Sequence, residues 1–395
     1  MALTGLCPPT FAPLHTLLTT ALTSGAELGL SFTVNHNGTT IIDLHGGHTD
    51  TARTQPWQAN TIVNVFSTTK GLAALAVLIL IDRGLVSPDD PVAEHWPEFA
   101  ANGKEALKIR HVLAHTSGVA GFDDKTGLED LFDERACADK LARQAPWWTP
   151  GTASGYHSWT YGYLLGEIVR RVTGLGLREF VVKEITTPLA GNNGGAVVDF
   201  QIGAPDEKDW GRISTLVPPP PFSVGGGGDL ANTKSIPVRS LMNPMISPTD
   251  ALTPAWRRAV IGSGNGHANA RSIAQVFSQV TLAGRKDQGG ILLSQKTAEL
   301  VFEEQALGPD LSVGQNWRLG LGYLIRGQGG TVLDDWLPDG RIAVWGGWGG
   351  SIVVMDLDRG LTIAYAMNKM AGTGPATPLL RKYVRVVYAA LGVEF

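Results

Sequence analysis

The sequence has little cysteine, no excess of positive charge and no long apolar run. Its 395 residues include only two cysteines, Cys7 and Cys137, which cannot build a disulfide framework or a cysteine-based zinc site. Lysine and arginine total 32 against 36 acidic residues, a net charge of −4, whereas a nucleic-acid binder usually shows a basic excess. The longest apolar run, residues 72–81, falls far short of the roughly 20 residues that a membrane helix needs. We therefore expect neither nucleic acid nor a membrane as a partner.

The chain also lacks the marks of a secreted protein. No lysine or arginine precedes an apolar stretch near the N-terminus, so no secretion signal is visible and we expect a cytoplasmic location. Hydrophobic residues make up 43% of the chain, which is enough to build a large core. The length predicts two to three domains.

Hydrophobic periodicity predicts strands near both ends of the chain. Residues 28–34 and 40–44 form strands on either side of an Asn-Gly turn, and residues 61–66 lead into a buried helix over 68–82. Further strands are predicted at residues 320–326, 341–345, 351–357 and 361–367, and further helices at 11–23 and 382–391. The pattern predicts an α/β (α+β) fold, with one antiparallel sheet that is built from both chain ends and flanked by helices.

The middle of the chain is expected to be a mostly helical insertion. We expect an α/β domain over residues 1–85 and 210–395, a helical domain over 86–209, and an active-site cleft between them. The clearest helix covers residues 163–172. Prolines at 218–221 and glycines at 225–228 cannot hold regular structure and predict an irregular loop over the cleft.

A candidate nucleophile lies where the third strand meets the buried helix. Ser67-Thr-Thr-Lys70 places a hydroxyl near a helix N-terminus and an amine one turn further on, facing the same side. A serine hydroxyl needs a neighbour to remove its proton, and burial of Lys70 would favour the neutral amine that can do so. The alternative is a helix-capping serine beside a surface lysine, and the spacing alone gives the two interpretations even weight.

Two more segments carry possible chemistry. Tyr156 follows a short Gly/Ser turn, and a phenol placed against Ser67 and Lys70 could shuttle a proton, although a core tyrosine is the commoner case. In Trp345-Gly-Gly-Trp-Gly-Gly-Ser351, glycines inside a strand pattern indicate close approach by a ligand or another backbone. Such an edge can offer a backbone N–H to an oxyanion, or it can be a bulge that eases sheet curvature.

Other reactive patterns are weak. His45 and His48 are two possible ligands in one turn, too few for a metal site, so we expect no metal and no cofactor. No Gly-x-Ser-x-Gly centres on any serine, which disfavours an α/β-hydrolase. His115 is interpreted as a histidine that braces a loop.

Taken together, these motifs resemble the penicillin-recognising fold of serine β-lactamases, and most of all the family VIII carboxylesterases, which look like class C β-lactamases. The similarity covers almost the whole chain. It comprises Phe66-Ser-Thr-Thr-Lys-Gly71, Val112-Leu-Ala-His-Thr-Ser-Gly118, Pro150-Gly151 with Tyr156-His157, Asn265-Gly-His-Ala-Asn-Ala-Arg271 and Trp345-Gly-Gly-Trp-Gly-Gly-Ser351.

The resemblance implies a role for each matching residue. Ser67 would be the acylated nucleophile, Lys70 its activating partner and Tyr156 the general base and acid. The backbone N–H groups of Ser67 and Trp348 would form the oxyanion hole. Substrate would contact residues of the third and second motifs, namely Trp345, Gly346, Gly347, His157 and Ser158. Trp345 stands where lactamases carry lysine and Ser158 where they carry asparagine, and both departures point toward esterases.

The sequence therefore predicts a serine hydrolase that cleaves small-molecule carboxylic esters through an acyl-enzyme on Ser67. An acyltransferase with the same acyl-enzyme is one alternative, and an amide or β-lactam hydrolase is another. A catalytically silent scaffold of the same fold is the third. The natural substrate and the oligomeric state stay open.

Overall fold

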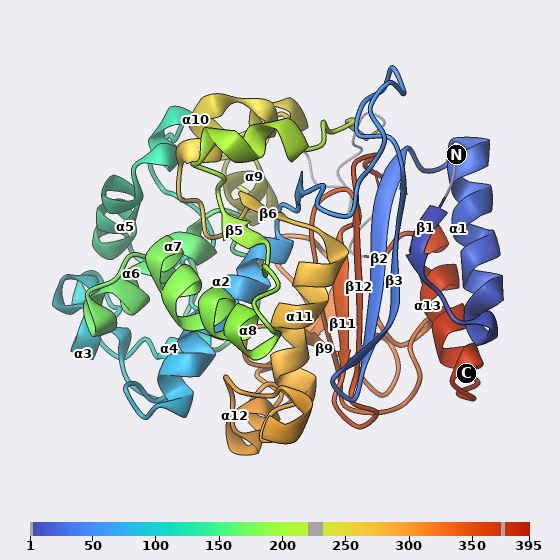
Figure 1. Ribbon diagram of the computed structural model, residues 1–395. Coiled ribbons are helices and arrows are strands. Elements are labelled where there is room, and N and C mark those ends of the chain that lie inside the picture. Colours follow the sequence, from blue (N-terminus) through green and yellow to red (C-terminus); the bar gives the residue numbers. More distant parts are fainter. Residues whose placement is uncertain (1–2, 220–231, 373–375) are drawn as a thin grey trace.

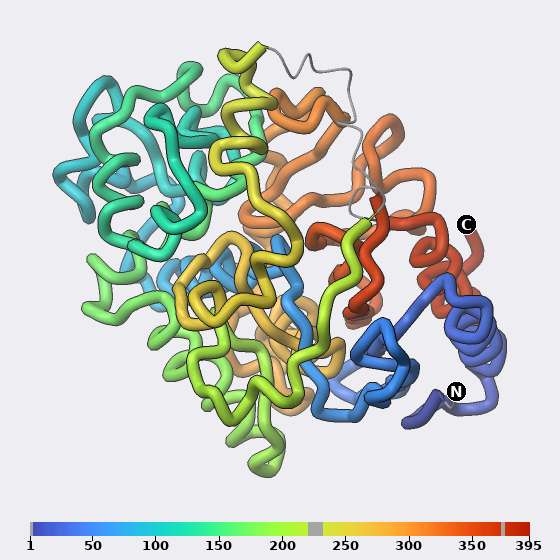
Figure 2. The backbone as a smooth tube through the Cα atoms, turned by 90° about the horizontal axis from the view of Figure 1, so that it is seen from above, coloured from blue at the N-terminus to red at the C-terminus, as the bar shows by residue number. Residues whose placement is uncertain are grey.

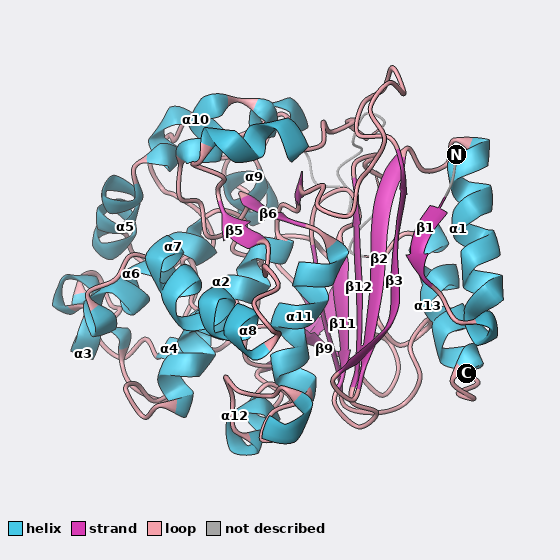
Figure 3. Cartoon of the chain, viewed as in Figure 1, coloured by secondary structure: helices cyan, strands magenta, loops and turns pink. Residues whose placement is uncertain are grey.

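The computed structural model of the protein describes residues 3–219, 232–372 and 376–395. Most of the predicted proline- and glycine-rich loop, at 218–221 and 225–228, lies outside these described residues. A large antiparallel sheet runs through one half of the molecule and helices make up most of the other half (Figures 1 and 3). No helix of the described ranges is long and apolar enough to cross a membrane.

The main sheet has nine strands in the order β1-β3-β2-β12-β11-β10-β9-β8-β7. Their bounds are β1 (Leu3–Leu6), β2 (Gly29–His36), β3 (Thr39–Gly47), β7 (Ala306–Pro309), β8 (Asn316–Leu319), β9 (Leu324–Ile325), β10 (Ile342–Gly346), β11 (Ile352–Asp356) and β12 (Leu361–Met367). N-terminal β2 pairs with C-terminal β12 along its whole length, from Leu30↔Met367 to His36↔Leu361. The prediction of one antiparallel sheet built from both chain ends is confirmed.

Helices cover both faces of this sheet. The first and last long helices, α1 (Ala12–Ser24) and α13 (Pro378–Ala390), lie side by side on one face, so both chain ends meet there (Figure 2). On the other face, α11 (Ala270–Thr281) packs on β2, β11 and β12. Side chains on both faces of the central strands therefore pack under helices, so β12 is buried along its whole length and β2 is buried up to its last residue, His36.

The helix α2 (Thr68–Asp82) is the centre of the molecule. Its first thirteen residues, from Thr68 to Leu80, are all buried, as the unbroken apolar run predicts for a helix with no solvent-facing side. It packs against α6 (Thr160–Thr173) and also contacts β10. The remaining helices are α3 (Val92–His95), α4 (Ile109–Leu113), α5 (Glu134–Arg143), α7 (Leu177–Phe180), α8 (Thr187–Asn192), α9 (Ile236–Leu241), α10 (Pro254–Arg258) and α12 (Gln295–Leu300).

Two features of the fold differ from the sequence prediction. The predicted strand 320–326 is wrong, because the chain reverses at Gly320 to Tyr323, where Gly320 N–H donates to the Tyr323 carbonyl and Gly322 has φ +89°. Within 320–326 only Leu324–Ile325 form a strand, β9, and β8 ends at Leu319, before the turn. The strand predicted at 61–66 contains β4 (Val63–Asn64). The second sheet that β4 forms with β6 (Gly266–Ala268) and β5 (Phe200–Ile202) was not predicted, since strands as short as β5 and β6 show no period.

Candidate active site

Ser67 lies at a sharp turn between β4 and α2. Phe66, just before it, has φ +43°, an unfavourable conformation for an aromatic residue that costs on the order of 1–3 kcal/mol. The Phe66 ring is held by Trp348 and Trp256, whose ring centroids lie 5.3 and 6.5 Å away. The turn leaves Ser67 half-buried immediately before the first residue of α2. Packing therefore maintains a strained backbone directly before the candidate nucleophile.

Lys70 is buried beside Ser67. Its Nζ donates to Ser67 Oγ at 3.1 Å and to the Ser263 carbonyl at 2.7 Å, and lies 4.8 Å from the centre of the Tyr156 ring. No part of the residue is exposed to solvent, and this burial lowers the pKa of Lys70 well below its ordinary value. The capping-serine and surface-lysine interpretation is therefore wrong for this lysine.

Tyr156 completes a three-residue cluster. Its hydroxyl donates to Ser67 Oγ at 2.6 Å, so the serine oxygen contacts both the amine and the phenol. Burial raises the pKa of Tyr156 above its ordinary value, which keeps the phenol protonated. Its backbone N–H donates to Asp310 Oδ1 at 3.0 Å, which ties the segment to the β7–β8 loop.

The glycine-rich segment after β10 runs against the chain around the nucleophile. A Cβ on Gly347 would lie 2.0 Å from the Val65 carbonyl oxygen, so only glycine permits this approach. Ser351 Oγ donates to the same carbonyl at 2.9 Å and fixes the loop in place. Within the described ranges, neither the Ser67 nor the Trp348 amide N–H donates to an acceptor of the chain. Both amides therefore keep a free N–H among the described residues.

The structure corrects the expected role of Trp345. Sequence analysis placed Trp345 against the substrate, but its indole Nε1 donates to the carbonyl of Ser67 at 2.8 Å and only 2% of the residue is exposed. A buried indole N–H needs an acceptor, and the carbonyl of Ser67, the residue before α2, supplies one. Gly346 is half-buried, and Ser158 lies half-buried two residues beyond Tyr156.

His157 is also not in a position to touch substrate. The ring is fully buried, with Nδ1 bonded to the Gly155 carbonyl at 2.7 Å and Nε2 to Ser117 Oγ at 2.5 Å. Burial lowers the pKa of His157 to about 4, so the ring is neutral at physiological pH. Its backbone N–H donates to Nδ1 of His115 at 3.1 Å, which agrees with the interpretation of His115 as a brace.

Sequence reasoning missed two residues around the cluster. The Ser263 carbonyl anchors Lys70, and the Asp310 carboxylate accepts N–H bonds from Tyr156, Ser312 and Val313. A main-chain carbonyl leaves no signal in a sequence. Asp310 looks like any acidic loop residue, 154 positions from its partner Tyr156.

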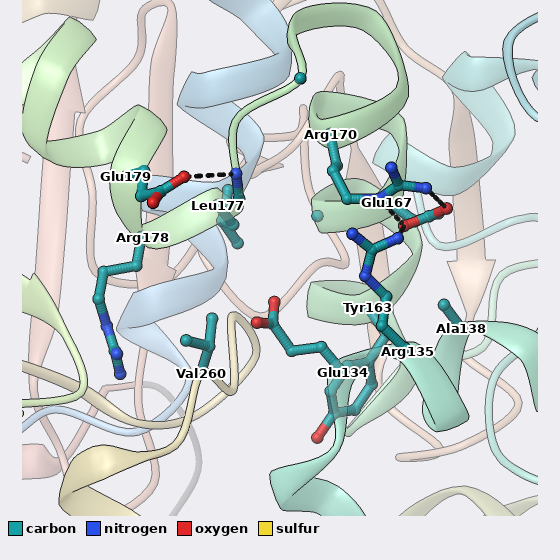
Figure 4. Close-up of a pocket in the computed structure, with 13 residues that line it drawn as sticks. Glu134, Arg135, Ala138, Tyr163, Glu167, Arg170, Leu177, Arg178, Glu179 and Val260 are labelled. Carbon is teal, nitrogen blue, oxygen red and sulfur yellow. Dashed lines mark hydrogen bonds and ion pairs between the residues drawn. The ribbon is translucent and has the colours of Figure 1, made fainter.

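A separate cavity of about 430 Å³ lies among α5, α6 and α7 (Figure 4). Glu134, Arg135, Glu167, Arg170, Arg178 and Glu179 line it, and none of the three cluster residues does. Glu167 pairs with Arg170 and Arg135, and the three carbonyls of Ile202, Arg258 and Ala259 accept from Arg178. Burial raises the pKa of Glu134 to about 7. The pairs that Glu167 forms with Arg170 and Arg135 neutralise part of the charge in this cavity, which is separate from the Ser67 cluster.

A serine oxygen held between a buried amine and a phenol, on this fold, defines a serine hydrolase. The chain belongs to the beta-lactamase family, whose model, described as Beta-lactamase, matches residues 14–387. The resemblance predicted from the sequence motifs is thus confirmed.

Three similar proteins illustrate the relationship. Esterase/beta-lactamase LipL of Mycobacterium tuberculosis (strain ATCC 25618 / H37Rv) is 29% identical over 349 residues, covering 87% of this chain and 77% of LipL. A solved family VIII carboxylesterase is 28% identical with a TM-score of 0.88, covering 99% of this chain and 100% of that one. A penicillin-binding protein homologue from Caulobacter crescentus is 32% identical, with the same TM-score and the same coverage.

Proposed function

We propose that the protein is a serine carboxylesterase that works through an acyl-enzyme on Ser67. The observation that carries this proposal is the position of Ser67 Oγ, 3.1 Å from Lys70 Nζ and 2.6 Å from the Tyr156 hydroxyl. Both groups can exchange a proton with the serine at these distances. The site lies between the sheet region, residues 1–85 and 210–395, and the helical region, residues 86–209, which we propose as two domains.

The pKa shifts favour a division of labour between the two partners. Burial lowers the pKa of Lys70, so its neutral amine takes the proton of Ser67 as Oγ attacks the ester carbonyl. Burial raises the pKa of Tyr156, so the phenol donates its proton to the leaving alcohol and regains one from Lys70. Tyr156 therefore serves first as an acid, whereas sequence analysis gave it the roles of both base and acid.

Acylation forms the Ser67 Oγ–acyl bond and breaks the bond between the acyl carbon and the alcohol oxygen. The negative charge on the carbonyl oxygen is stabilised by the N–H groups of Ser67 and Trp348, which donate to no acceptor of the described residues. Water then attacks the acyl carbon and gives a proton to Lys70, the bond between Ser67 Oγ and the acyl carbon breaks, and Lys70 returns the proton to Oγ as the acid leaves. Gly346, Gly347 and Ser158 are proposed to border the substrate.

The charge of the site supports uncharged esters as the substrate class. Where the resemblance places a lysine that attracts the carboxylate of a β-lactam, this chain has Trp345, which brings no charge. We expect a nitrophenyl acyl ester to be hydrolysed faster than a chromogenic cephalosporin. Faster turnover of the cephalosporin would contradict this substrate class and favour β-lactam hydrolysis.

The test of the reaction uses Ser67→Ala, with Ser24→Ala at the end of α1 as the control. The wild type and the control should label with a fluorophosphonate and release a burst of alcohol, and Ser67→Ala should do neither. Absence of labelling in the wild type would instead indicate a silent scaffold. Supplying an acyl thioester with alcohols separates the esterase from an acyltransferase, because only the latter forms new ester faster than free acid.

A further inference from the structure

Trp345 links the candidate nucleophile to a column of buried rings. Its indole lies parallel to the His115 ring, with a centroid distance of 5.2 Å and an interplanar angle of 4°. His115 stacks in turn on Tyr161, at 4.3 Å and 17°, and the Tyr161 hydroxyl donates to the Leu113 carbonyl at 3.0 Å. From the near end of this column, the indole N–H donates to the Ser67 carbonyl. The column thus connects β10, the helical region and the start of α2.

We propose that Trp345 is a positioning residue that fixes the nucleophile of this enzyme through its indole N–H bond to the Ser67 carbonyl. The proposal rests on the acyl-enzyme function above and goes beyond it, because the third-motif tryptophan acts on the protein rather than on the substrate. In this role Trp345 is not a catalytic residue, since it touches no reacting atom.

Burial and bonding both exclude Trp345 as a substrate contact. Only 2% of the residue is exposed, its one donor is bonded at 2.8 Å, and His115 covers one face of the ring. Trp317 meets the indole at 72° with centroids 6.3 Å apart. A ligand would have to displace these rings to reach it.

The same side chain also fixes where Tyr156 lies relative to Ser67. The Tyr156 ring lies 6.2 Å from Trp345 and 5.4 Å from His115, so its hydroxyl reaches Ser67 Oγ from a phenol packed on the column. Ser67 and Tyr156 come from segments 89 residues apart, and Trp345 contacts both. Its indole bond to Ser67 reaches the turn after Phe66 from β10, next to the bond from Ser351 Oγ to the Val65 carbonyl.

The test compares Trp345→Phe with Trp336→Phe. Both substitutions remove a buried indole N–H that donates to a backbone carbonyl, at 2.8 Å for Trp345 and at 2.9 Å, to Val332, for Trp336. Trp336 is 1% exposed and its indole N–H bonds to Val332, outside the cluster, so its variant measures the cost of losing a buried indole bond alone. The readouts are kcat and KM for esters of several chain lengths and the rate of fluorophosphonate labelling, which depends on Ser67 without a natural substrate.

We expect Trp345→Phe to lower kcat and the labelling rate about tenfold, the size of one hydrogen bond, by the same factor for every ester and with KM unchanged. Trp336→Phe should keep both rates. A rise in KM that depends on chain length would assign Trp345 to the substrate, and equal rates in the two variants would make its bond merely structural; either result overturns the proposal. If the wild type itself does not label, the proposed function has failed rather than the assignment of Trp345.

Discussion

Lys70 and Lys104 are both fully buried lysines, in two different regions of the molecule. Each Nζ lies over an aromatic ring, Tyr156 at 4.8 Å for Lys70 and Phe99 at 5.0 Å for Lys104. Their partners differ. Lys104 donates to two backbone carbonyls, of Ala101 and Gln144, whereas Lys70 donates to one carbonyl and to the hydroxyl of Ser67.

The difference shows why burial alone does not make a base. A carbonyl only accepts hydrogen bonds, so two carbonyls favour the charged ammonium of Lys104 and oppose the loss of its proton. A hydroxyl accepts or donates, so Lys70 keeps its bond to Ser67 whether or not it carries the proton. Burial lowers the pKa of both lysines, and it does so most strongly for Lys70. Only Lys70 therefore has both a weakened hold on its proton and a group that can supply one.

The sharpest test of this contrast replaces each lysine with methionine. Lys70→Met should lower kcat about 10³-fold, because no neutral amine remains to take the serine proton. Lys104→Met should keep kcat per folded molecule and change only stability, since it leaves two buried carbonyls without a donor. Kinetics on variants whose folding is checked by circular dichroism measure both effects. A large loss of kcat in Lys104→Met would break the comparison.

The second test removes the phenol from the same cluster. Tyr156→Phe keeps the ring over Lys70 but loses the hydroxyl that donates to Ser67 Oγ at 2.6 Å. We expect kcat to fall about 10²-fold, with a larger loss for esters of poor leaving alcohols, which need a proton most. Tyr163→Phe, whose buried hydroxyl donates to the Leu131 carbonyl at 2.6 Å, is the control. A loss that is the same for good and poor leaving groups would contradict the role of Tyr156 as an acid.

The part of the cluster that is local in sequence could be predicted. Ser67 and Lys70 are one helical turn apart, and the helix over 68–82 follows from an unbroken apolar run, so neither depends on how distant segments meet. The central strands, such as residues 361–367, were predictable for the same reason. The role of Tyr156 was predicted from the order of motifs in the family it resembles. The residues next to Tyr156 in the sequence do not indicate that role by themselves.

The contacts around the cluster could not be predicted, because they depend on the register and packing of segments that are distant in sequence. The bond from Trp345 to Ser67 spans 278 residues and is set by where β10 meets α2, which no spacing encodes. The same holds for Asp310 against Tyr156. His157 adjoins Tyr156 in sequence, yet its ring bonds to Ser117 whereas the Tyr156 hydroxyl bonds to Ser67.

The pH profile extends the lysine comparison to the wild type. Since the neutral amine of Lys70 is the reactive form, kcat/KM should rise about tenfold per pH unit up to its lowered pKa and then level off. The raised pKa of Tyr156 predicts no fall on the alkaline side below about pH 10. Initial rates with an uncharged ester, corrected for its spontaneous hydrolysis, give the curve. A decline beginning near pH 8 would contradict this. It would indicate that the reaction needs the charged form of Lys70, or that the Tyr156 phenol loses its proton near that pH.

Asp310, on the β7–β8 loop, provides a smaller test, because it holds the segment that carries Tyr156. Its Oδ1 accepts the Tyr156 N–H at 3.0 Å, so Asp310→Ala should loosen the phenol and lower kcat about tenfold. Asp310→Asn keeps an acceptor at this position and should recover most of that loss. Equal losses in the two variants would mean that the charge, rather than the hydrogen bond, is what Tyr156 requires.

The smallest expected effect concerns Glu27, a buried acid far from Ser67 in the chain. It compares the buried lysines with a buried group that has no catalytic role. Glu27 is 5% exposed and accepts a bond from the Tyr365 hydroxyl, and burial raises its pKa from 4.5 to about 7. A raised folded-state pKa stabilises the fold below pH 4.5, and this contribution is lost as the pH rises toward 7. Glu27→Gln cannot ionise, so it should exceed the wild type by about 3 kcal/mol in unfolding free energy at pH 8 and lose that advantage near pH 4.5. Urea unfolding at both pH values measures this, with exposed Glu105→Gln as the control. Equal pH dependence in Glu27→Gln and the wild type would show that this carboxyl keeps its charge in the folded protein.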